Sequence, residues 1–214
     1  MDTRKKEAIR YLGYGKTVID DKILSMIQEC FEELETISVP KCVYRIFEFS
    51  FQQEDELQIC NLHIKSKNLY KNLRGCDQVV LLGTTLGSAV DRTLRSYELT
   101  NIAKAVVMQA CAAAMLEDYC DEMQEKIAQQ LAEENLYLRP RFSPGYGDCS
   151  ILHQKEILDM LDAPKRIGLT MTDAYMLVPT KSVTAIIGVS NTKEPCHQKG
   201  CEECTKEDCL YRRS

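Results

Sequence analysis

The sequence predicts an α+β protein, in which a mixed or antiparallel sheet packs against a long central helix and flanking helices. Apolar runs at helical spacing alternate with short strand-like runs, residues 101–135 contain neither proline nor glycine, and no repeat divides the chain. With 214 residues, of which 44% are hydrophobic and 28% charged, the chain is long enough to bury a substantial core.

The first half of the chain is expected to begin with an amphipathic helix. Apolar residues recur at helical spacing over 20–35, and Asp20 or Asp21 is a natural N-cap for them. The elements expected next are two strand-like runs over 43–51 and 57–64 that form a hairpin, a short helix over 66–74, a strand over 78–82, a turn over 83–87 and a helix from Ser88 onward.

The second half is dominated by the alanine-rich segment 101–135, which predicts one long helix. The six alanines between residues 103 and 114 leave little side-chain bulk, so that either another element packs closely against the helix or a ligand lies on it. The elements expected after it are a strand-like run over 136–142, a Pro-Gly turn, a helix over 152–161, and apolar runs over 174–178 and 183–189. We therefore expect one domain over 1–190 and a small cysteine-rich tail over 191–214.

The charge balance and the N-terminal residues exclude several classes of function. Lys and Arg number 27 against 32 Asp and Glu, a net charge of −5, without the basic excess that binding to nucleic acid needs. Charged residues stand where a secretory signal would have its apolar stretch, and no apolar run reaches the length of about 18 residues of a membrane span. We expect a cytoplasmic protein whose partners include neither nucleic acid nor a membrane.

The tail contains four cysteines with the spacing C-x4-C-x2-C-x4-C, namely Cys196, Cys201, Cys204 and Cys209. Residues 191–209 include no Val, Ile, Leu, Met or aromatic residue and cannot form a core of their own. Four thiolates around one metal or cluster would order such a segment. The spacing is neither that of ferredoxins nor that of zinc ribbons, so zinc, an iron–sulfur cluster and a tail of free thiols all remain open. His197 could replace one ligand.

The other motifs carry no catalytic signature. The turn 83–87 lacks the lysine and the third glycine of phosphate-binding loops, which favours a plain strand-to-helix turn. The three histidines are scattered, and no G-x-S-x-G elbow occurs. Cys149 lies in a glycine-rich turn without a base beside it in sequence, which favours a buried small residue.

The segment 139–148 joins two arginines to a turn rich in proline and glycine. Pro144 fixes its own φ and Gly145 permits a close approach, so backbone groups can be presented to a small ligand. Arg141 could hold the carboxylate of that ligand through two parallel hydrogen bonds. By itself, however, this pattern is more often a hairpin turn with surface arginines than a binding site.

A set of motifs in this region extends toward the C-terminus. It consists of Arg141-x-x-Pro144-Gly145-Tyr146, a helix, residues 169–175, Pro179 and Ser182-Val183. In these motifs the chain resembles the activation domain of cobalamin-dependent methionine synthase, most closely over 137–189. In that family the domain binds S-adenosylmethionine in a shallow groove. It supplies the methyl group that, with one electron, rescues cobalamin from the inactive cob(II)alamin form.

The resemblance implies a role for four residues of the turn. Arg141 would hold the carboxylate of S-adenosylmethionine, and Ser143 and Gly145 would offer backbone contacts. Tyr146 would border the sulfonium and its methyl group. Because a methylsulfonium needs no acid or base to activate its methyl group, such a site works by orientation and electrostatics, and no catalytic triad is expected.

The sequence departs from the family pattern in three respects, one of which is the cysteine tail, which has no counterpart in the multidomain enzymes. The family places a glutamate of the long helix against the ammonium of the ligand, but alignment on Tyr119 puts Ala114 at that position. Glu117 or Asp118 would substitute, unless both are solvated helix residues. The D-x-H-x-x-G pattern of cobalamin-binding domains is also absent, so we expect the corrinoid to arrive on another polypeptide and the protein to act in trans.

The resemblance thus implies S-adenosylmethionine-dependent methyl transfer to cob(II)alamin on a separate corrinoid-binding methionine synthase, which would be reactivated. An iron–sulfur cluster in the tail could replace the flavodoxin that otherwise acts as electron donor. Two alternatives remain open. One is a non-catalytic module that binds or assembles a corrinoid protein, and the other is an activation protein of a related corrinoid methyltransferase.

Overall fold

The computed structural model describes residues 3–14 and 19–192. Its helices are α1 (Thr3–Tyr11), α2 (Asp21–Ile37), α3 (Lys67–Leu73), α4 (Ser88–Thr100), α5 (Ile102–Ala132), the 3-10 helix η1 (Ile151–His153), α6 (Gln154–Leu161) and α7 (Ala163–Ile167). Its strands are β1 (Lys41–Glu48), β2 (Ser50–Gln53), β3 (Glu56–Ile59), β4 (Leu62–Lys65), β5 (Gln78–Thr85), β6 (Tyr137–Leu138), β7 (Thr170–Met171), β8 (Leu177–Val178) and β9 (Ser182–Ser190). No helix among these residues is long and apolar enough to cross a membrane.

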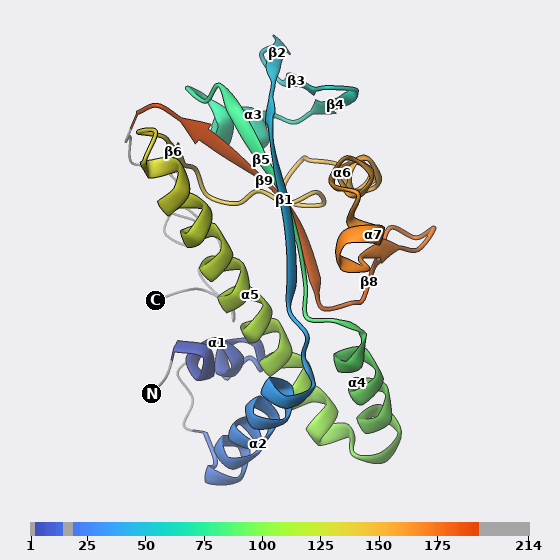
Figure 1. The fold of residues 1–214 in the computed structure, drawn as a ribbon. Coiled ribbons are helices and arrows are strands. Elements are labelled where there is room, and N and C mark those ends of the chain that lie inside the picture. The colour runs from blue at the N-terminus through green and yellow to red at the C-terminus, as the bar shows by residue number, and fades with distance from the viewer. Residues whose placement is uncertain (1–2, 15–18, 193–214) are drawn as a thin grey trace.

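A four-stranded antiparallel sheet with the order β1-β5-β9-β6 lies at the centre of the molecule. Figure 1 views this sheet from its β1 edge, with α5 along one face and α6 and α7 on the other. Val79 and Leu81 of β5 belong to the hydrophobic cluster with α6, whereas Val80 and Leu82 belong to the cluster with α5. Because both faces of β5 are covered, its sequence is continuously apolar rather than alternating.

The long helix α5 spans the molecule and confirms the helix predicted over 101–135 (Figure 1). Its first half packs with α1, α2 and α4, and its second half contacts the sheet through Ile127 and Leu131. Ala112 and Ala114 are buried in the cluster with α1 and α2. The small side chains of this stretch therefore serve close helix packing.

The helix predicted over 20–35 is confirmed as α2. Its cap is Asp20, whose carboxylate accepts a hydrogen bond from the N–H of Lys22 at 3.1 Å. The sequence pattern does not predict α1, because only Ala8 and Ile9 of its nine residues are buried and an apolar stripe is missing.

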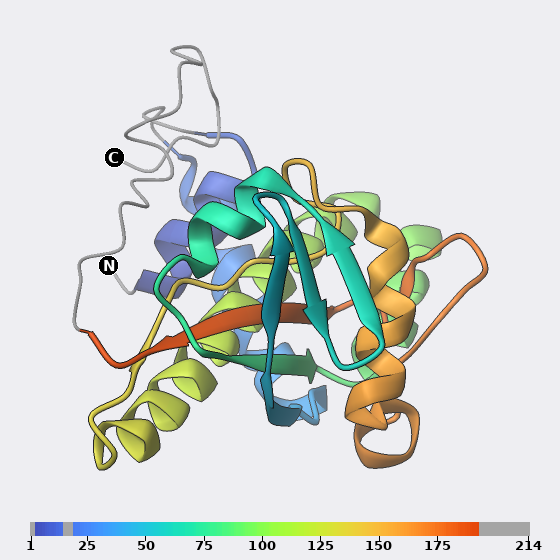
Figure 2. The same ribbon diagram turned by 90° about the horizontal axis from the view of Figure 1, so that it is seen from above.

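The hairpin predicted for the runs 43–51 and 57–64 is confirmed only beside its turn, where Ser50 and Phe51 pair with Gln58 and Leu57. All eight residues of β1 pair with β5 in the central sheet. The second run folds back on itself as the hairpin β3–β4, and β2 pairs with β3 in a separate small sheet (Figure 2). The turn of this hairpin holds Cys60 at a φ of 52°. Since cysteine is not a residue that signals a left-handed turn, the sequence pattern does not reveal it.

The turn between β5 and α4 is shorter than predicted, because β5 continues to Thr85. The N–H of Leu86 donates to the carbonyl of Lys181 at 2.9 Å, and the N–H of Gly87 donates to the Thr85 hydroxyl at 3.1 Å. Both N–H groups are hydrogen-bonded within the protein rather than presented to a phosphate, which confirms a plain strand-to-helix turn.

Candidate functional site

The segment between β6 and η1 carries the four candidate residues Arg141, Ser143, Gly145 and Tyr146. It is held to the central sheet at Phe142, which exchanges two backbone hydrogen bonds with Ile186 of β9, at 2.9 and 2.7 Å. The Phe142 side chain is buried in the cluster formed with α6. The pairing therefore fixes the position along β9 at which the segment crosses the sheet, namely at Ile186.

A second attachment holds the turn to α3. The carboxylate of Asp148 accepts hydrogen bonds from the Ser66 hydroxyl at 2.5 Å and from the N–H groups of Lys67 and Asn68 at 2.8 and 3.2 Å. The bond from Ser66, helped by the two N–H groups, lowers the pKa of Asp148. The turn is thus fixed by a carboxylate at a helix N-terminus, unlike an ordinary surface hairpin.

Hydrogen bonds within the turn limit the groups that could face a ligand. The N–H of Gly145, whose φ is 85°, donates to the carbonyl of Cys149 at 2.9 Å, and the N–H of Tyr146 donates to the carbonyl of Ser143 at 3.1 Å. A ligand that contacts Ser143 and Gly145, as the resemblance implies, would have to use other groups of these two residues. These are the carbonyl of Gly145 and the amide or hydroxyl of Ser143.

Tyr146 and Cys149 have opposite surroundings. The Tyr146 side chain is 71% exposed and meets the Phe142 ring edge-on, with centroids 6.0 Å apart. It therefore presents an aromatic ring at the surface beside the turn.

Cys149 is 2% exposed, and burial raises the pKa of its thiol to about 11. It is a buried small residue, as predicted.

The Arg141 side chain lies on one face of α5. Its Nη2 is 2.6 Å from the Asp121 carboxylate and 3.1 Å from that of Glu117, and its Nη1 donates to the Gln124 side-chain oxygen at 3.0 Å. The three partners share a helix face because they are four and then three residues apart. Burial lowers the pKa of Arg141, but the carboxylates of Asp121 and Glu117 outweigh burial and raise it.

The structure distinguishes the two acids that the sequence offers in place of the family glutamate. Glu117 contacts Arg141, whereas the Asp118 carboxylate lies 3.7 Å from Arg4 of α1. Asp121 and Gln124 are absent from the sequence-based set of candidates. The signal that could reveal them is their helical spacing from Glu117, which places all three on one face.

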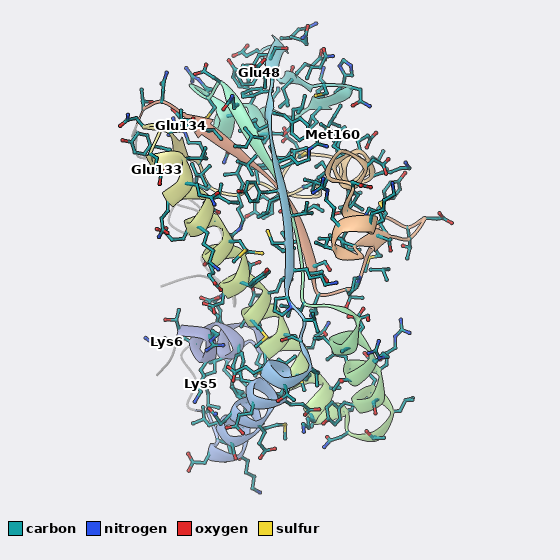
Figure 3. All side chains as sticks on the ribbon, in the orientation of Figure 1. Lys5, Lys6, Glu48, Glu133, Glu134 and Met160 are labelled. Carbon is teal, nitrogen blue, oxygen red and sulfur yellow. The ribbon has the colours of Figure 1, made fainter. Side chains whose placement is uncertain are left out.

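A groove of about 680 Å³ adjoins this cluster. Its lining comes from the second half of α5 and from the β6 segment, and comprises Asp121, Gln124, Glu125, Ala128, Gln129, Ala132, Leu136, Tyr137, Leu138, Arg139 and Thr192. Glu133 and Glu134, labelled in Figure 3, mark the end of α5 toward which the groove extends. Its volume suits a small organic ligand.

The four tail cysteines lie outside the described residues. Within residues 3–14 and 19–192, no group of three or more His, Cys, Asp or Glu side chains could hold a metal ion. The division into a domain over 1–190 and a tail over 191–214 stays a prediction.

Comparisons with known proteins identify related sequences and folds. The sequence profile described as "Vitamin B12 dependent methionine synthase, activation domain" matches residues 52–209, from β2 to the last tail cysteine. Among solved structures, the crystal structure of the MetH reactivation domain bound to AdoHcy is similar, with a TM-score of 0.62 and 16% sequence identity. The likeness covers 82% of this chain and 66% of that chain, so the chain spans about two thirds of its length. No curated protein sequence matches.

Proposed function

The chain belongs to the vitamin B12-dependent methionine synthase activation domain family, and on this premise we propose that it reactivates a corrinoid-binding methionine synthase in trans. It binds S-adenosylmethionine and reductively methylates the cob(II)alamin that the partner carries. The observation that carries this proposal is the Arg141–Glu117 pair beside the groove along α5.

The pair suits the amino-acid end of S-adenosylmethionine, which bears a carboxylate and an ammonium on the same carbon. Arg141 provides a planar guanidinium for the carboxylate, and Glu117 provides a carboxylate for the ammonium. The exposed ring of Tyr146 can border the sulfonium, because a cation is attracted to the face of an aromatic ring.

The proposed reaction needs one electron and one methyl group. Cob(II)alamin accepts an electron from a one-electron donor and becomes cob(I)alamin, whose cobalt attacks the methyl carbon. The carbon–sulfur bond breaks, its electron pair stays on sulfur, and the products are methylcobalamin and S-adenosylhomocysteine. The protein contributes by holding the methyl group in place before the electron arrives, since the reduction is uphill and capture must be fast.

A spectroscopic assay tests this function. The protein is mixed anaerobically with S-adenosylmethionine, a one-electron reductant and methionine synthase loaded with cob(II)alamin, and the visible spectrum is followed. We expect methylcobalamin to form, and to form much more slowly with cobalamin free in solution. Binding of S-adenosylmethionine without methylation would favour the non-catalytic module instead. Faster methylation on another corrinoid methyltransferase would favour that partner.

We also propose that Cys196, Cys201, Cys204 and Cys209 bind zinc or an iron–sulfur cluster. The support is their spacing in a segment without large apolar residues, together with the family match that extends through Cys209. A cluster could deliver the electron to cobalamin, whereas zinc has no redox chemistry and would only order the tail.

Metal analysis of protein purified with and without oxygen distinguishes these cases. Zinc should be bound in both preparations, whereas a cluster should give brown, oxygen-sensitive protein only without oxygen. Cys204→Ser should reduce the bound metal severalfold. Cys60→Ser is the matched control, because Cys60 is an exposed thiol in the β3–β4 turn, and this variant should keep its metal. Metal-free protein from both preparations would instead indicate free thiols.

A further inference from the structure

We infer that Asp121 is an internal competitor for the carboxylate of the ligand. It pairs with the Arg141 guanidinium and withdraws when a ligand with an α-amino acid end binds. This inference rests on the proposed function, because it takes S-adenosylmethionine and S-adenosylhomocysteine as the ligands of Arg141.

The geometry of the guanidinium requires such an exchange. A carboxylate can bind a guanidinium in bidentate fashion at the Nε–Nη2 edge or at the Nη1–Nη2 edge, and both edges include Nη2. In this protein Nη2 has two carboxylates beside it, that of Asp121 at 2.6 Å and that of Glu117 at 3.1 Å. A ligand carboxylate can therefore reach either edge only after one of these acids withdraws.

The exposure of the two acids indicates which one withdraws. The Asp121 side chain is 73% exposed, whereas that of Glu117 is 36% exposed. Asp121 can rotate into water at little cost, because a carboxylate in water is fully solvated. Glu117 then remains to accept hydrogen bonds from the ammonium. One carboxylate replaces another, so the Arg141 charge is compensated before and after the exchange.

The exchange has a functional consequence, because each binding event must break the Asp121–Arg141 ion pair. Asp121 thereby weakens the binding of every ligand that uses Arg141, including the product S-adenosylhomocysteine. A weaker hold on the product favours its release after methyl transfer. Substituting a residue that lines a groove ordinarily weakens ligand binding. Asp121 lines this groove, yet removing its charge should tighten the binding of ligands that use Arg141.

Calorimetry with S-adenosylhomocysteine tests the inference, since this ligand is a zwitterion without the sulfonium charge. Asp121→Asn should bind it about two- to fivefold more tightly than the wild type, the range that an exposed ion pair contributes. The matched control is Asp118→Asn, which removes the same charge one residue away, where the carboxylate lies near Arg4, and leaves the affinity unchanged. Methylthioadenosine, which lacks the amino-acid end, should bind the wild type and Asp121→Asn equally well.

The outcomes separate the inference from the proposed function. If the wild type binds S-adenosylhomocysteine and Asp121→Asn binds it equally or more weakly, the inference is wrong and the proposed function stands. If neither protein binds it, both are wrong. Binding by Asp121→Asn alone would support the inference and show that the competitor suppresses binding in the wild type. Thermal unfolding of each variant verifies that it is folded.

Discussion

Arg141→Ala is expected to weaken the binding of S-adenosylmethionine by about 1.5 to 3 kcal/mol, or about 10- to 150-fold in the dissociation constant. The substitution removes the guanidinium that is proposed to pair with the ligand carboxylate, and it leaves Glu117 and Asp121 without their shared cation. Arg141→Lys should recover only part of the affinity, because an ammonium cannot form two parallel hydrogen bonds to a carboxylate. Calorimetry measures the dissociation constant of S-adenosylmethionine for the wild type, Arg141→Ala and Arg141→Lys.

The control for Arg141→Ala is Arg92→Ala. It removes the same charge from an exposed position of α4, where the Arg92 side chain donates to the Ser88 hydroxyl. Its affinity for S-adenosylmethionine should match that of the wild type. Equal affinity of Arg141→Ala and the wild type would mean that the ligand carboxylate binds elsewhere.

Leu81→Ala is expected to lower the free energy of unfolding by about 2 to 5 kcal/mol, the range for a large buried side chain whose removal leaves a cavity. Leu81 is 0% exposed in the central strand β5, where it lies opposite Arg45 of β1 and Ile186 of β9. It belongs to the same hydrophobic cluster as Phe142, which anchors the site segment. The loss of packing around Leu81 should therefore weaken the anchoring of the site segment at Phe142 as well as the sheet.

Urea unfolding measures this effect against Leu99→Ala, which makes the same chemical change at a position of α4 that is 89% exposed. The control should change the free energy of unfolding by less than about 0.5 kcal/mol. Similar small changes in both variants would contradict the central position of β5 in the core.

The elements that the sequence predicts correctly are those with a strong local pattern. The alanine-rich segment forms α5, and the apolar spacing after Asp20 forms α2 with that residue as its cap. The hairpin predicted between two strand-like runs is confirmed only where Ser50 and Phe51 pair with Gln58 and Leu57, and it is wrong for β1, which pairs with β5 instead. A strand pattern shows that a segment is extended but not which partner it takes, because pairing depends on contacts between segments far apart in the chain.

The candidate site shows the same difference between local sequence patterns and contacts of distant segments. The sequence by itself determined the Arg141–Tyr146 motif and its likeness to the activation domains, since these are short runs of residues whose order carries the information. Only the tertiary structure decided that Arg141 meets Glu117 and Asp121 rather than Asp118. Arg141 and Glu117 are 24 residues apart, and their contact exists because Phe142 pairs with Ile186 and so sets where the segment crosses α5. That crossing is a product of sheet pairing and helix packing, which no local pattern in either segment encodes.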